Sequence, residues 1–445
     1  MSTMTAAIAV TPMESWIAQR LAVPEESLTR ASIAQYQLTA LQQTVAFARS
    51  HSSFYDHRLR GLACDLPRSL DEFASLPLTS PVDLTEHTPG FLCVPQDKVS
   101  RIVTLHSSGT GGAPKRVFFT AEDQELALDF FAHGVGAMAS RGDRMLIALP
   151  GQREGSVGYQ LAMGISRAGV VPIPHGFSID AAQTLAHMEH EGATCIIGLP
   201  VQMLALARRD SALAASVFRR LRSIVLCSDH VPDSILKTLR QRFAGEVFQH
   251  YGSTEMGLGG GVDCEAHMGY HLRETDLYFE IVSPETGEPL PDGELGEVVF
   301  TTLNRRAMPL IRYRTGDLAR FLPGPCACGS ILRRLEKVRS RRDGLVSLGT
   351  FGSISISMLD EALFDVPELL DFKATVFQGE PRRLELAIHA PGAEGAHLDE
   401  IVLRALHTIP AIRSARETGG VEVNVVHSPE TFSCTGAKRK VEVHA

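Results

Sequence analysis

Apolar positions along the chain follow a helical spacing first and an alternation of strands and helices afterwards. Residues 25–50 carry apolar side chains at the three-to-four-residue interval of a helix with one buried face. Turn residues between Pro67 and Pro81 then interrupt that pattern. We therefore expect the first hundred residues to be mostly helical.

From Arg101 onward, short apolar runs alternate with amphipathic stretches. The predicted strands are 102–105, 145–150, 170–174, 194–200, 223–227 and 247–250, and the predicted helices between them include 180–191 and 233–243. Strands that alternate with helices are typical of a parallel sheet covered by helices. The pattern predicts an α/β fold whose main sheets are mostly parallel.

The pattern changes twice towards the C-terminus. Residues 277–303 form strand, polar turn and strand with no helix between them, which predicts a small antiparallel unit. A basic stretch, 333–342, precedes a final segment that alternates strands and helices. Its predicted strands are 371–377, 383–389 and 421–426, and its predicted helices are 357–364 and 398–408. We expect a large N-terminal domain over residues 1–342 and a small, mobile α+β domain over residues 343–445.

Composition narrows the classes of function. The 445 residues are 44% hydrophobic and 21% charged, as in a soluble globular protein, and the net charge of -8 disfavours a general nucleic-acid-binding surface. The N-terminus lacks a secretory signal, and no apolar run is long enough for a membrane span. Eight cysteines are too few for a disulfide scaffold of this size. We expect a cytoplasmic protein with no nucleic-acid or membrane partner.

The segment 105–119, LHSSGTGGAPKRVFF, is the first with candidate chemistry. Closely packed hydroxyls and glycine amides can surround a polyphosphate, because glycine lets the backbone approach and direct its N–H groups at the anion. Its spacing differs from that of a P-loop. A flexible polar turn is the alternative interpretation. The residues concerned are Ser107, Ser108, Gly109, Thr110, Gly111, Gly112 and Lys115.

Two later segments carry carboxylates at turns. In FQHYGSTEMG, Glu255 follows a strand, where a carboxylate can hold Mg²⁺ together with phosphate oxygens; a turn with a helix-capping Thr254 is the alternative. In LIRYRTGDLARF, Asp317 follows a Thr-Gly pair and can accept hydrogen bonds from both ribose hydroxyls. A turn aspartate that bonds its own backbone is the alternative there.

The three segments, in this order and spacing, resemble the phosphate loop, the Tyr-Gly-x-Thr-Glu motif and the Tyr-Arg-Thr-Gly-Asp motif of the adenylate-forming superfamily. That superfamily includes acyl-CoA synthetases, luciferases and peptide-synthetase adenylation domains. The chain is most similar to the phenylacetate–CoA ligase branch in three features: its short length, the segment SSGTGGAPK and the block of residues 284–329. The resemblance covers residue 30 to the end and is densest over residues 245–330.

The resemblance implies residue roles. The loop 107–115 would bind the β- and γ-phosphates, Thr254 the α-phosphate, Glu255 the Mg²⁺ ion and Asp317 the ribose. Adenine would lie near Ser228, Asp229 and His230, although the family's usual Gly-Ala-Glu is absent there. The remaining nucleotide-binding positions that the resemblance implies are Tyr251, Gly252, Ser253 and Arg341.

The C-terminal part resembles the family less closely. Arg341 to Gly344 resembles the Gly-Arg-x-Asp-Asp hinge, which makes Asp343 the expected pivot. In FSCTGAKRKVEV, Ala437 occupies the position of the family's catalytic lysine, and either Lys438 or Lys440 would serve instead. A solvated basic tail is the alternative interpretation.

A metal site is also predicted. Cys264 and His271 lie seven residues apart, and Cys326 and Cys328 follow downstream. Three thiolates and an imidazole suit tetrahedral Zn²⁺, and the reaction needs no water-activating metal, so we expect a structural site. His267 is a spare ligand candidate, and a chance cluster is the alternative.

The resemblance implies ATP- and Mg²⁺-dependent activation of an aryl or arylacetic acid to an acyl-adenylate, followed by transfer to coenzyme A. The acid pocket would include Phe118, Tyr159 and His230, and related enzymes suggest a homodimer. Two alternatives stay open: an adenylating enzyme with an amine or a carrier protein as acceptor, and a degenerate nucleotide-binding homologue.

Overall fold

The computed structural model describes residues 11–61, 66–105, 114–178, 180–342, 344–393, 395–432 and 439–444. The chain forms two compact units, each assembled from separate segments. Unit 1 comprises Met1–Gly142, Tyr159–Val171 and Phe248–Val338, and unit 2 comprises Asp143–Gly158, Pro172–Val247 and Arg339–Ala445. The division into domains at residues 342 and 343 stays a prediction.

The N-terminal region of unit 1 is helical, as predicted. Its helices are α1 (Met13–Arg20), α2 (Arg30–His51), α3 (Ser53–Arg58), α4 (Leu70–Ala74) and α5 (Pro81–Glu86). The long helix begins at Arg30 rather than at residue 25, because Thr29 and Ser32 form a capping box in which each side chain bonds the other's backbone amide.

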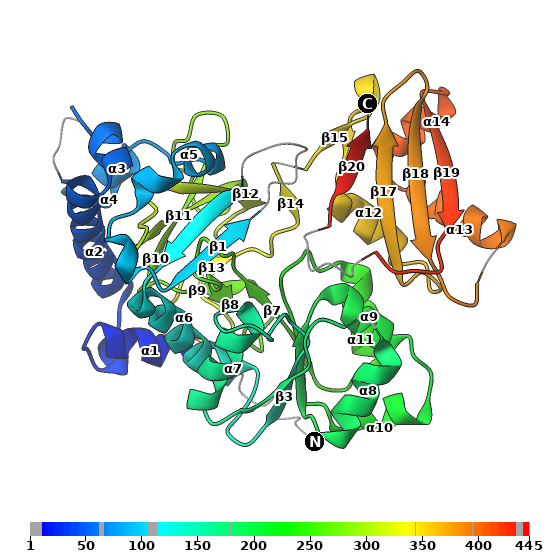
Figure 1. Cartoon of the computed structure of the whole chain (residues 1–445), viewed down its shortest axis with the longest axis horizontal. Coiled ribbons are helices and arrows are strands. Elements are labelled where there is room, and N and C mark those ends of the chain that lie inside the picture. The colour runs from blue at the N-terminus through cyan, green and yellow to red at the C-terminus, as the bar shows by residue number, and fades with distance from the viewer. Residues whose placement is uncertain are drawn as a thin grey trace. The chain divides into compact units, whose positions relative to one another are not determined.

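An antiparallel sheet forms the core of unit 1. Strands β10 (Leu277–Val282), β11 (Gly296–Thr302) and β12 (Tyr313–Ala319) pair in sequence order, which confirms the predicted antiparallel unit and adds a strand to it. Helix α2 lies beside this sheet (Figure 1), where Thr44 Oγ1 donates a hydrogen bond of 2.8 Å to the carbonyl of Leu303.

Strand β1 (Arg101–Leu105) differs from its expected place in the parallel sheet. It pairs antiparallel with β2 (Lys115–Phe119) in a separate two-stranded sheet. Only nine residues separate the two strands in sequence, which is fewer than the dozen or more that a crossover between parallel strands needs. Unit 1 also contains α6 (Ala121–Gly134), and helix α7 (Val157–Arg167) lies mostly in it.

Strand β7 (Glu246–Tyr251) carries the chain from unit 2 into unit 1. Inside unit 1, it pairs antiparallel with β8 (Gly261–Val262), β8 pairs with β9 (Tyr270–Leu272), and β9 pairs with β13 (Arg334–Leu335). These short strands bring Tyr270 and His271 beside residues 334–335.

Unit 2 contains the parallel strands that the sequence predicts. Strand β3 (Arg144–Ile147) pairs parallel with β5 (Cys195–Gly198), and β5 pairs parallel with β6 (Ser223–Leu226). Strand β4 (Val171–Pro174) lies next to β3. The connecting helices are α8 (Ala181–His190), α9 (Pro200–Ala207), α10 (Ala212–Arg220) and α11 (Asp233–Arg242). The mixed α/β fold class is confirmed.

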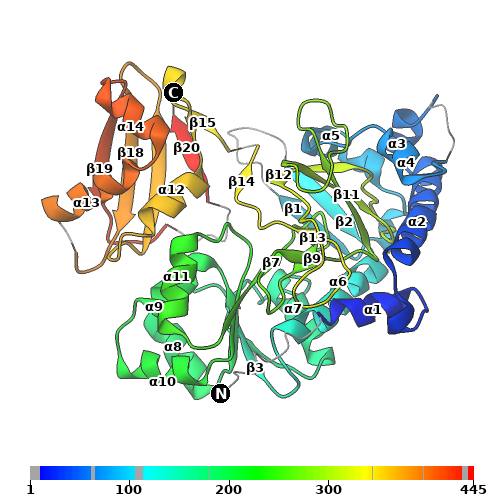
Figure 2. The same cartoon turned by 180° about the vertical axis from the view of Figure 1, so that it is seen from behind.

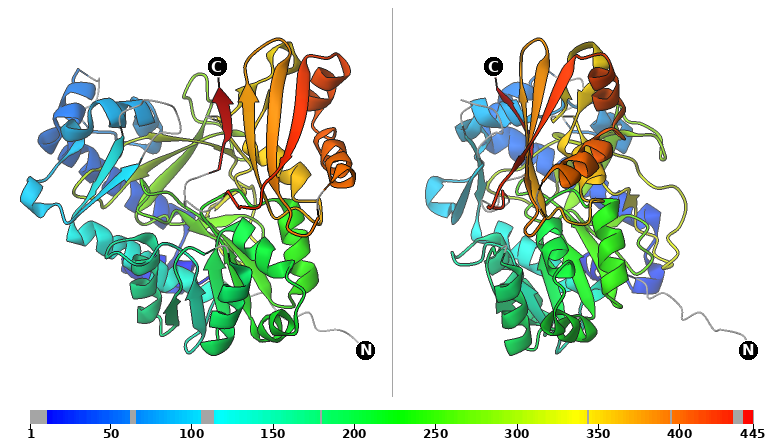
Figure 3. Two further views of the ribbon diagram at one scale, coloured as in Figure 1. Left: turned by 45° about the vertical axis from the view of Figure 1, so that its right-hand side comes forward. Right: turned by 90° about the vertical axis from the view of Figure 1, so that its right-hand side faces the viewer.

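The C-terminal segment contains a four-stranded sheet in the order β19 (Val421–His427), β18 (Arg382–His389), β17 (Asp371–Phe377) and β20 (Val441–His444). Helices α12 (Ile356–Leu363), α13 (Ala396–Leu406) and α14 (Pro410–Glu417) cover one face of it (Figures 2 and 3). The predicted strands and helices of this segment are confirmed. Three two-residue strands precede it: β14 (Ser340–Arg341), β15 (Val346–Ser347) and β16 (Ser353–Ile354).

Within the described ranges, no helix combines the length and the apolar character that crossing a lipid bilayer requires.

Candidate active site

Two predicted site residues from distant parts of the sequence meet in unit 1. Lys115 begins β2, and its Nζ forms an ion pair with Oε1 of Glu255, which lies just after β7. Tyr313, the first residue of β12, bridges them: its hydroxyl lies 3.2 Å from Lys115 Nζ and donates to Glu255 Oε1 over 3.4 Å. The side chain of Lys115 is 18% exposed and that of Glu255 is 10% exposed. A cation therefore lies against this carboxylate in a site with limited access to water.

The turn that carries Glu255 is tightly constrained by its own backbone. Gly252 allows a close approach, because a Cβ atom there would lie 2.5 Å from the carbonyl oxygen of Leu258. The carbonyl of Thr254 accepts the amide of Gly257 at 3.0 Å, and Ser253 Oγ accepts the amide of Met256 at 3.3 Å. The turn 251–257 is thus shaped by sequence-local contacts, which fixes where its carboxylate can lie.

Asp317 and Tyr251 join the second and third motifs. The Tyr251 hydroxyl donates a hydrogen bond of 2.8 Å to Oδ2 of Asp317, and Asp317 is only 8% exposed. Asp317 lies within β12 rather than at a turn, and its amide bonds Thr315 Oγ1 at 3.0 Å. Its carboxylate is therefore held by a partner 66 residues away in the sequence.

Among the described residues, unit 2 contains the predicted residues Ser228, Asp229, His230 and Arg341. Ser228, with a left-handed φ of 72°, and Asp229 follow β6, and Arg341 lies in β14. His230 Nε2 lies 3.0 Å from Oε1 of Glu361 in helix α12, with the His230 side chain 10% exposed. His230 therefore contacts the C-terminal segment.

The two other predicted pocket residues lie in unit 1. Phe118 lies on β2, opposite Ile102 of β1, and its side chain is partly buried. Tyr159 lies on α7 and is 36% exposed. Neither position identifies the acid. Several predicted residues lie outside the described residues: Ser107, Ser108, Gly109, Thr110, Gly111, Gly112, Asp343 and Lys438.

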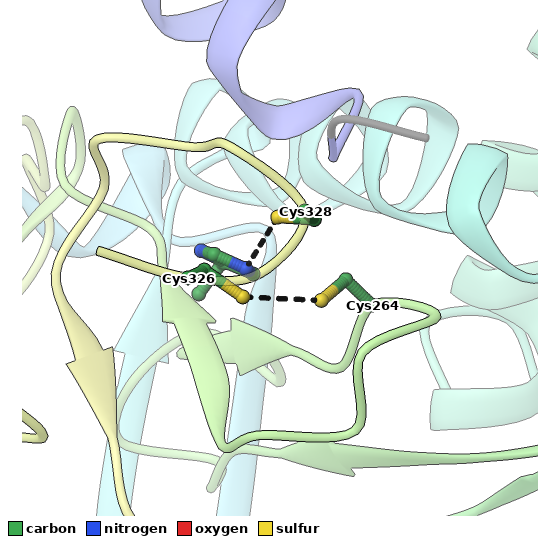
Figure 4. Close-up of side chains that lie close together, drawn as sticks. Cys264, Cys326 and Cys328 are labelled. Atoms are coloured by element: carbon green, nitrogen blue, oxygen red, sulfur yellow. Dashed lines mark hydrogen bonds between the residues drawn. The ribbon is translucent and has the colours of Figure 1, made fainter. Parts of the chain in front are cut away.

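The four predicted metal ligands converge in a second cluster of unit 1. Cys264 follows β8, His271 lies on β9, and Cys326 and Cys328 come from one loop between β12 and β13 (Figure 4). All four side chains are buried, and their ligand atoms lie within 4.8 Å of one another.

The distances inside this cluster suit a tetrahedral metal site. Cys264 Sγ lies 3.7 Å from Cys326 Sγ, and Cys328 Sγ lies 3.4 Å from His271 Nε2. In a tetrahedron, Zn–S bonds of about 2.3 Å and Zn–N bonds of about 2.0 Å place the ligand atoms about 3.5–3.8 Å apart. His267 points elsewhere, with its Nδ1 3.0 Å from Oδ2 of Asp263.

Comparisons with known proteins group this chain with AMP-binding enzymes. Residues 35–304 match the family model described as AMP-binding enzyme. The chain is 30% identical to a phenylacetate–coenzyme A ligase of Pseudomonas putida, over 85% of this chain and 86% of that protein. It is 29% identical to a phenylacetate–coenzyme A ligase of Thermus thermophilus, over 80% of each chain.

The chain belongs to the AMP-binding enzyme family. Within that family it belongs to the phenylacetate–CoA ligase branch, which makes it an AMP-forming CoA ligase by class. ATP, a carboxylic acid and coenzyme A are the substrates that this class implies. A crystal structure of 2-hydroxyisobutyryl-CoA ligase in the postadenylation state shares the fold of this AMP-binding enzyme. It has a TM-score of 0.75 and 19% identity, and the match covers 94% of this chain and 90% of that chain.

The structure adds two residues to the candidate site that the sequence motifs do not single out. Tyr313 lies inside the third motif, and Arg305 lies between the second and third motifs. The Arg305 guanidinium is buried and donates a hydrogen bond of 2.6 Å to the backbone carbonyl of Glu255. An arginine in a pair such as Arg305 and Arg306 gives no signal of such a contact, since the sequence does not show which of the two side chains is buried.

Proposed function

We propose that the chain converts an aryl or arylacetic acid into its acyl-adenylate and then transfers the acyl group to coenzyme A. The convergence of Lys115, Glu255 and Tyr313 in unit 1 supports this proposal, because an ammonium beside a carboxylate suits the binding of a triphosphate together with its metal ion. The names of the two phenylacetate–coenzyme A ligases support the choice of acid and acceptor.

In the first step, a carboxylate oxygen attacks the α-phosphorus of ATP, and the bond to the leaving pyrophosphate breaks. The reactants are both anions, so positioning and charge neutralisation supply most of the rate. Lys115 would turn its ammonium from Glu255 to the phosphates. The hydroxyl of Tyr313 would keep a hydrogen bond to the carboxylate while Lys115 leaves.

Glu255 fits a magnesium ion. Mg²⁺ is commonly held by one or two carboxylates together with substrate phosphates, and Glu255 already accommodates a cation at its Oε1. When bound, the ion would supply neutralisation of the phosphate charge. Thr254 would contact the α-phosphate and Asp317 the ribose, with Tyr251 orienting the Asp317 carboxylate through its hydroxyl.

In the second step, the thiol sulfur of coenzyme A attacks the carbonyl carbon, AMP leaves with the anhydride oxygen, and the thiol proton is released. We propose that the small C-terminal domain moves about Asp343 between the two steps, so that a lysine serves only the first. Lys438 would be that lysine. Its neighbour Arg439 is anchored by an ion pair with Asp360 and by a bond of 3.2 Å to the carbonyl of Phe372.

Replacing Lys438 with alanine is expected to slow adenylate formation on the order of 100-fold, because developing phosphate charge loses a cation. Thioester formation from a synthetic acyl-adenylate should continue at the wild-type rate. The two half-reactions are measured separately, with Lys440→Ala as the matched control. If Lys440→Ala slows adenylation instead, the assignment moves to Lys440; equal losses in both half-reactions would rule out a role limited to the first.

The cysteine cluster would hold a structural Zn²⁺ ion through Cys264, His271, Cys326 and Cys328. The four donors would complete a tetrahedral shell, which would leave no position open for a reacting water. The ion would link the loop after β8 to the loop before β13.

A substrate panel tests the proposed function. Pyrophosphate release and thioester mass are measured with benzoic, phenylacetic, hydroxy and short-chain acids, with and without coenzyme A. We expect pyrophosphate release that depends on the acid and that proceeds through multiple turnovers only when coenzyme A is present. We also expect the mass of an aryl or arylacetyl thioester. Multiple turnovers without coenzyme A would identify another acceptor. ATP binding with no release of pyrophosphate in the presence of any acid would favour a degenerate homologue, and the alanine at position 437 would then explain the lost activity.

A further inference from the structure

Arg305 is a buried cation that neither the motifs nor the proposed chemistry uses. It lies after β11, is 7% exposed, and places its guanidinium 4.9 Å from the centre of the Phe119 ring. Burial, together with the nearby positive charge of Arg273, lowers the pKa of Arg305 to about 10, although the negative charges of Asp123 and Glu255 oppose this shift. The side chain therefore stays protonated at neutral pH, and a buried charge of this kind needs partners.

The partners of Arg305 come from two elements of the candidate site. Its Nη1 donates to the carbonyl of Glu255 at 2.6 Å, and its ring contact, Phe119, lies on β2, the strand that begins with Lys115. One guanidinium thus touches both the turn that carries the carboxylate and the strand that carries the ammonium. Arginine suits this position because a planar guanidinium can stack and donate at the same time.

The surroundings hold Arg305 in place. Oδ1 and Oδ2 of Asp123 accept the amides of Arg306 at 2.7 Å and Ala307 at 2.9 Å, which fixes the backbone beside it. Gly257 leaves room for the guanidinium, since a Cβ atom there would lie 3.1 Å from Arg305 Nη2. Because these contacts fix the position of Arg305, its side chain can hold the Glu255 turn in place.

We propose that Arg305 is a positioning residue for magnesium–ATP: it locks the Glu255 turn against strand β2, so that the carboxylate and Lys115 meet the phosphates in one fixed arrangement. The proposal rests on the function proposed above. Loss of Arg305 should therefore impair magnesium–ATP binding and rate as well as stability, because a displacement of about 1 Å at a reacting group can slow a reaction on the order of 100-fold.

The test uses Arg305→Gln, Arg305→Lys and the control Arg306→Gln in the full chain. Arg306 is exposed, and its guanidinium lies 5.1 Å from the Phe47 ring, so the control removes a neighbouring charge without touching the turn. ATP binding is measured by calorimetry across a magnesium titration without any acid, beside thermal unfolding and the pyrophosphate assay.

We expect Arg305→Gln to raise the magnesium concentration needed for half-maximal ATP binding by about 10-fold or more, as loss of an orienting partner typically does. For Arg305→Lys this magnesium concentration should lie between the values of Arg305→Gln and wild type. An ammonium can donate a hydrogen bond to the carbonyl of Glu255, but it lacks the planar group that stacks on the Phe119 ring. Arg306→Gln should match wild type.

The proposal would be overturned if folded Arg305→Gln needed the same magnesium concentration as wild type for half-maximal ATP binding, even if its melting temperature were lower. If that variant does not fold, Arg305→Lys decides in the same way: a wild-type titration overturns the proposal. Because the binding titration contains no acid, it gives an answer even if the wild-type protein releases no pyrophosphate with any acid tested.

Discussion

Replacing Glu255 with glutamine is expected to slow acid-dependent pyrophosphate release by about 100-fold or more. The neutral amide has the same shape but lacks the charge that would hold Mg²⁺ and that now pairs with Lys115. Folding should survive, since the backbone of the turn is held by its own contacts and by Arg305. Steady-state rates across a magnesium titration measure the effect.

The control for this variant is Glu294→Gln, which makes the same chemical change at an exposed turn. It should leave both the rate and the magnesium dependence at wild-type values. A Glu255→Gln enzyme with the wild-type rate would contradict the assignment of Glu255 as the magnesium ligand, whatever the fate of the proposed substrate.

The second large effect is expected at the cysteine cluster. Cys326→Ser should abolish zinc binding and lower the free energy of unfolding by about 3 kcal/mol or more, because loss of a structural metal is one of the changes that destabilise proteins strongly. For a unit of this size, that loss lowers the melting temperature by about 6–12 °C. Elemental analysis of the purified protein and thermal unfolding measure the two effects.

Cys227→Ser is the matched control, since Cys227 is a buried thiol in unit 2 and outside the cluster. It should retain the full complement of zinc, as should His267→Gln, because His267 bonds Asp263 instead of facing the four donors. The structural site would be ruled out by two results together. The wild-type protein would carry no zinc after expression in zinc-supplemented medium, and it would melt at the same temperature as Cys326→Ser.

Much of the fold could be predicted from the sequence, because its strands are short, apolar and separated by helical periodicity. Strands β5 and β6 are buried at every position, and fully buried parallel strands give continuous apolar runs. Strand β1 has a similar apolar run, but its partner β2 begins only ten positions after β1 ends. Strand direction depends on such connections, which apolar periodicity does not record.

Pairwise contacts at the site were harder to predict than its motifs. The motifs named Lys115 and Glu255, yet their ion pair joins residues 140 positions apart and depends on how β2 and β7 are placed in the folded unit. The hydrogen bond between Tyr251 and Asp317 is of the same kind. Residue type predicts what each side chain can do, whereas only the fold determines which side chains meet.

The role of Arg305 could not be predicted for a different reason. Residues 305 and 306 are both arginine, and nothing in the local sequence distinguishes the buried side chain from the exposed one. Their difference follows from Asp123, which binds the two amides after Arg305 and so sets the direction of the chain. Buried polar partners of this kind become visible only in three dimensions.

The most direct test of the central claim follows an oxygen atom from the acid to AMP. An aryl or arylacetic acid that supports pyrophosphate release is labelled with heavy oxygen in its carboxylate and incubated with the enzyme, ATP, magnesium and coenzyme A. Attack on the α-phosphorus predicts that the AMP formed carries one labelled oxygen, because the thiol later displaces that oxygen together with AMP. Unlabelled AMP, or formation of ADP and phosphate in place of AMP and pyrophosphate, would contradict activation through an acyl-adenylate.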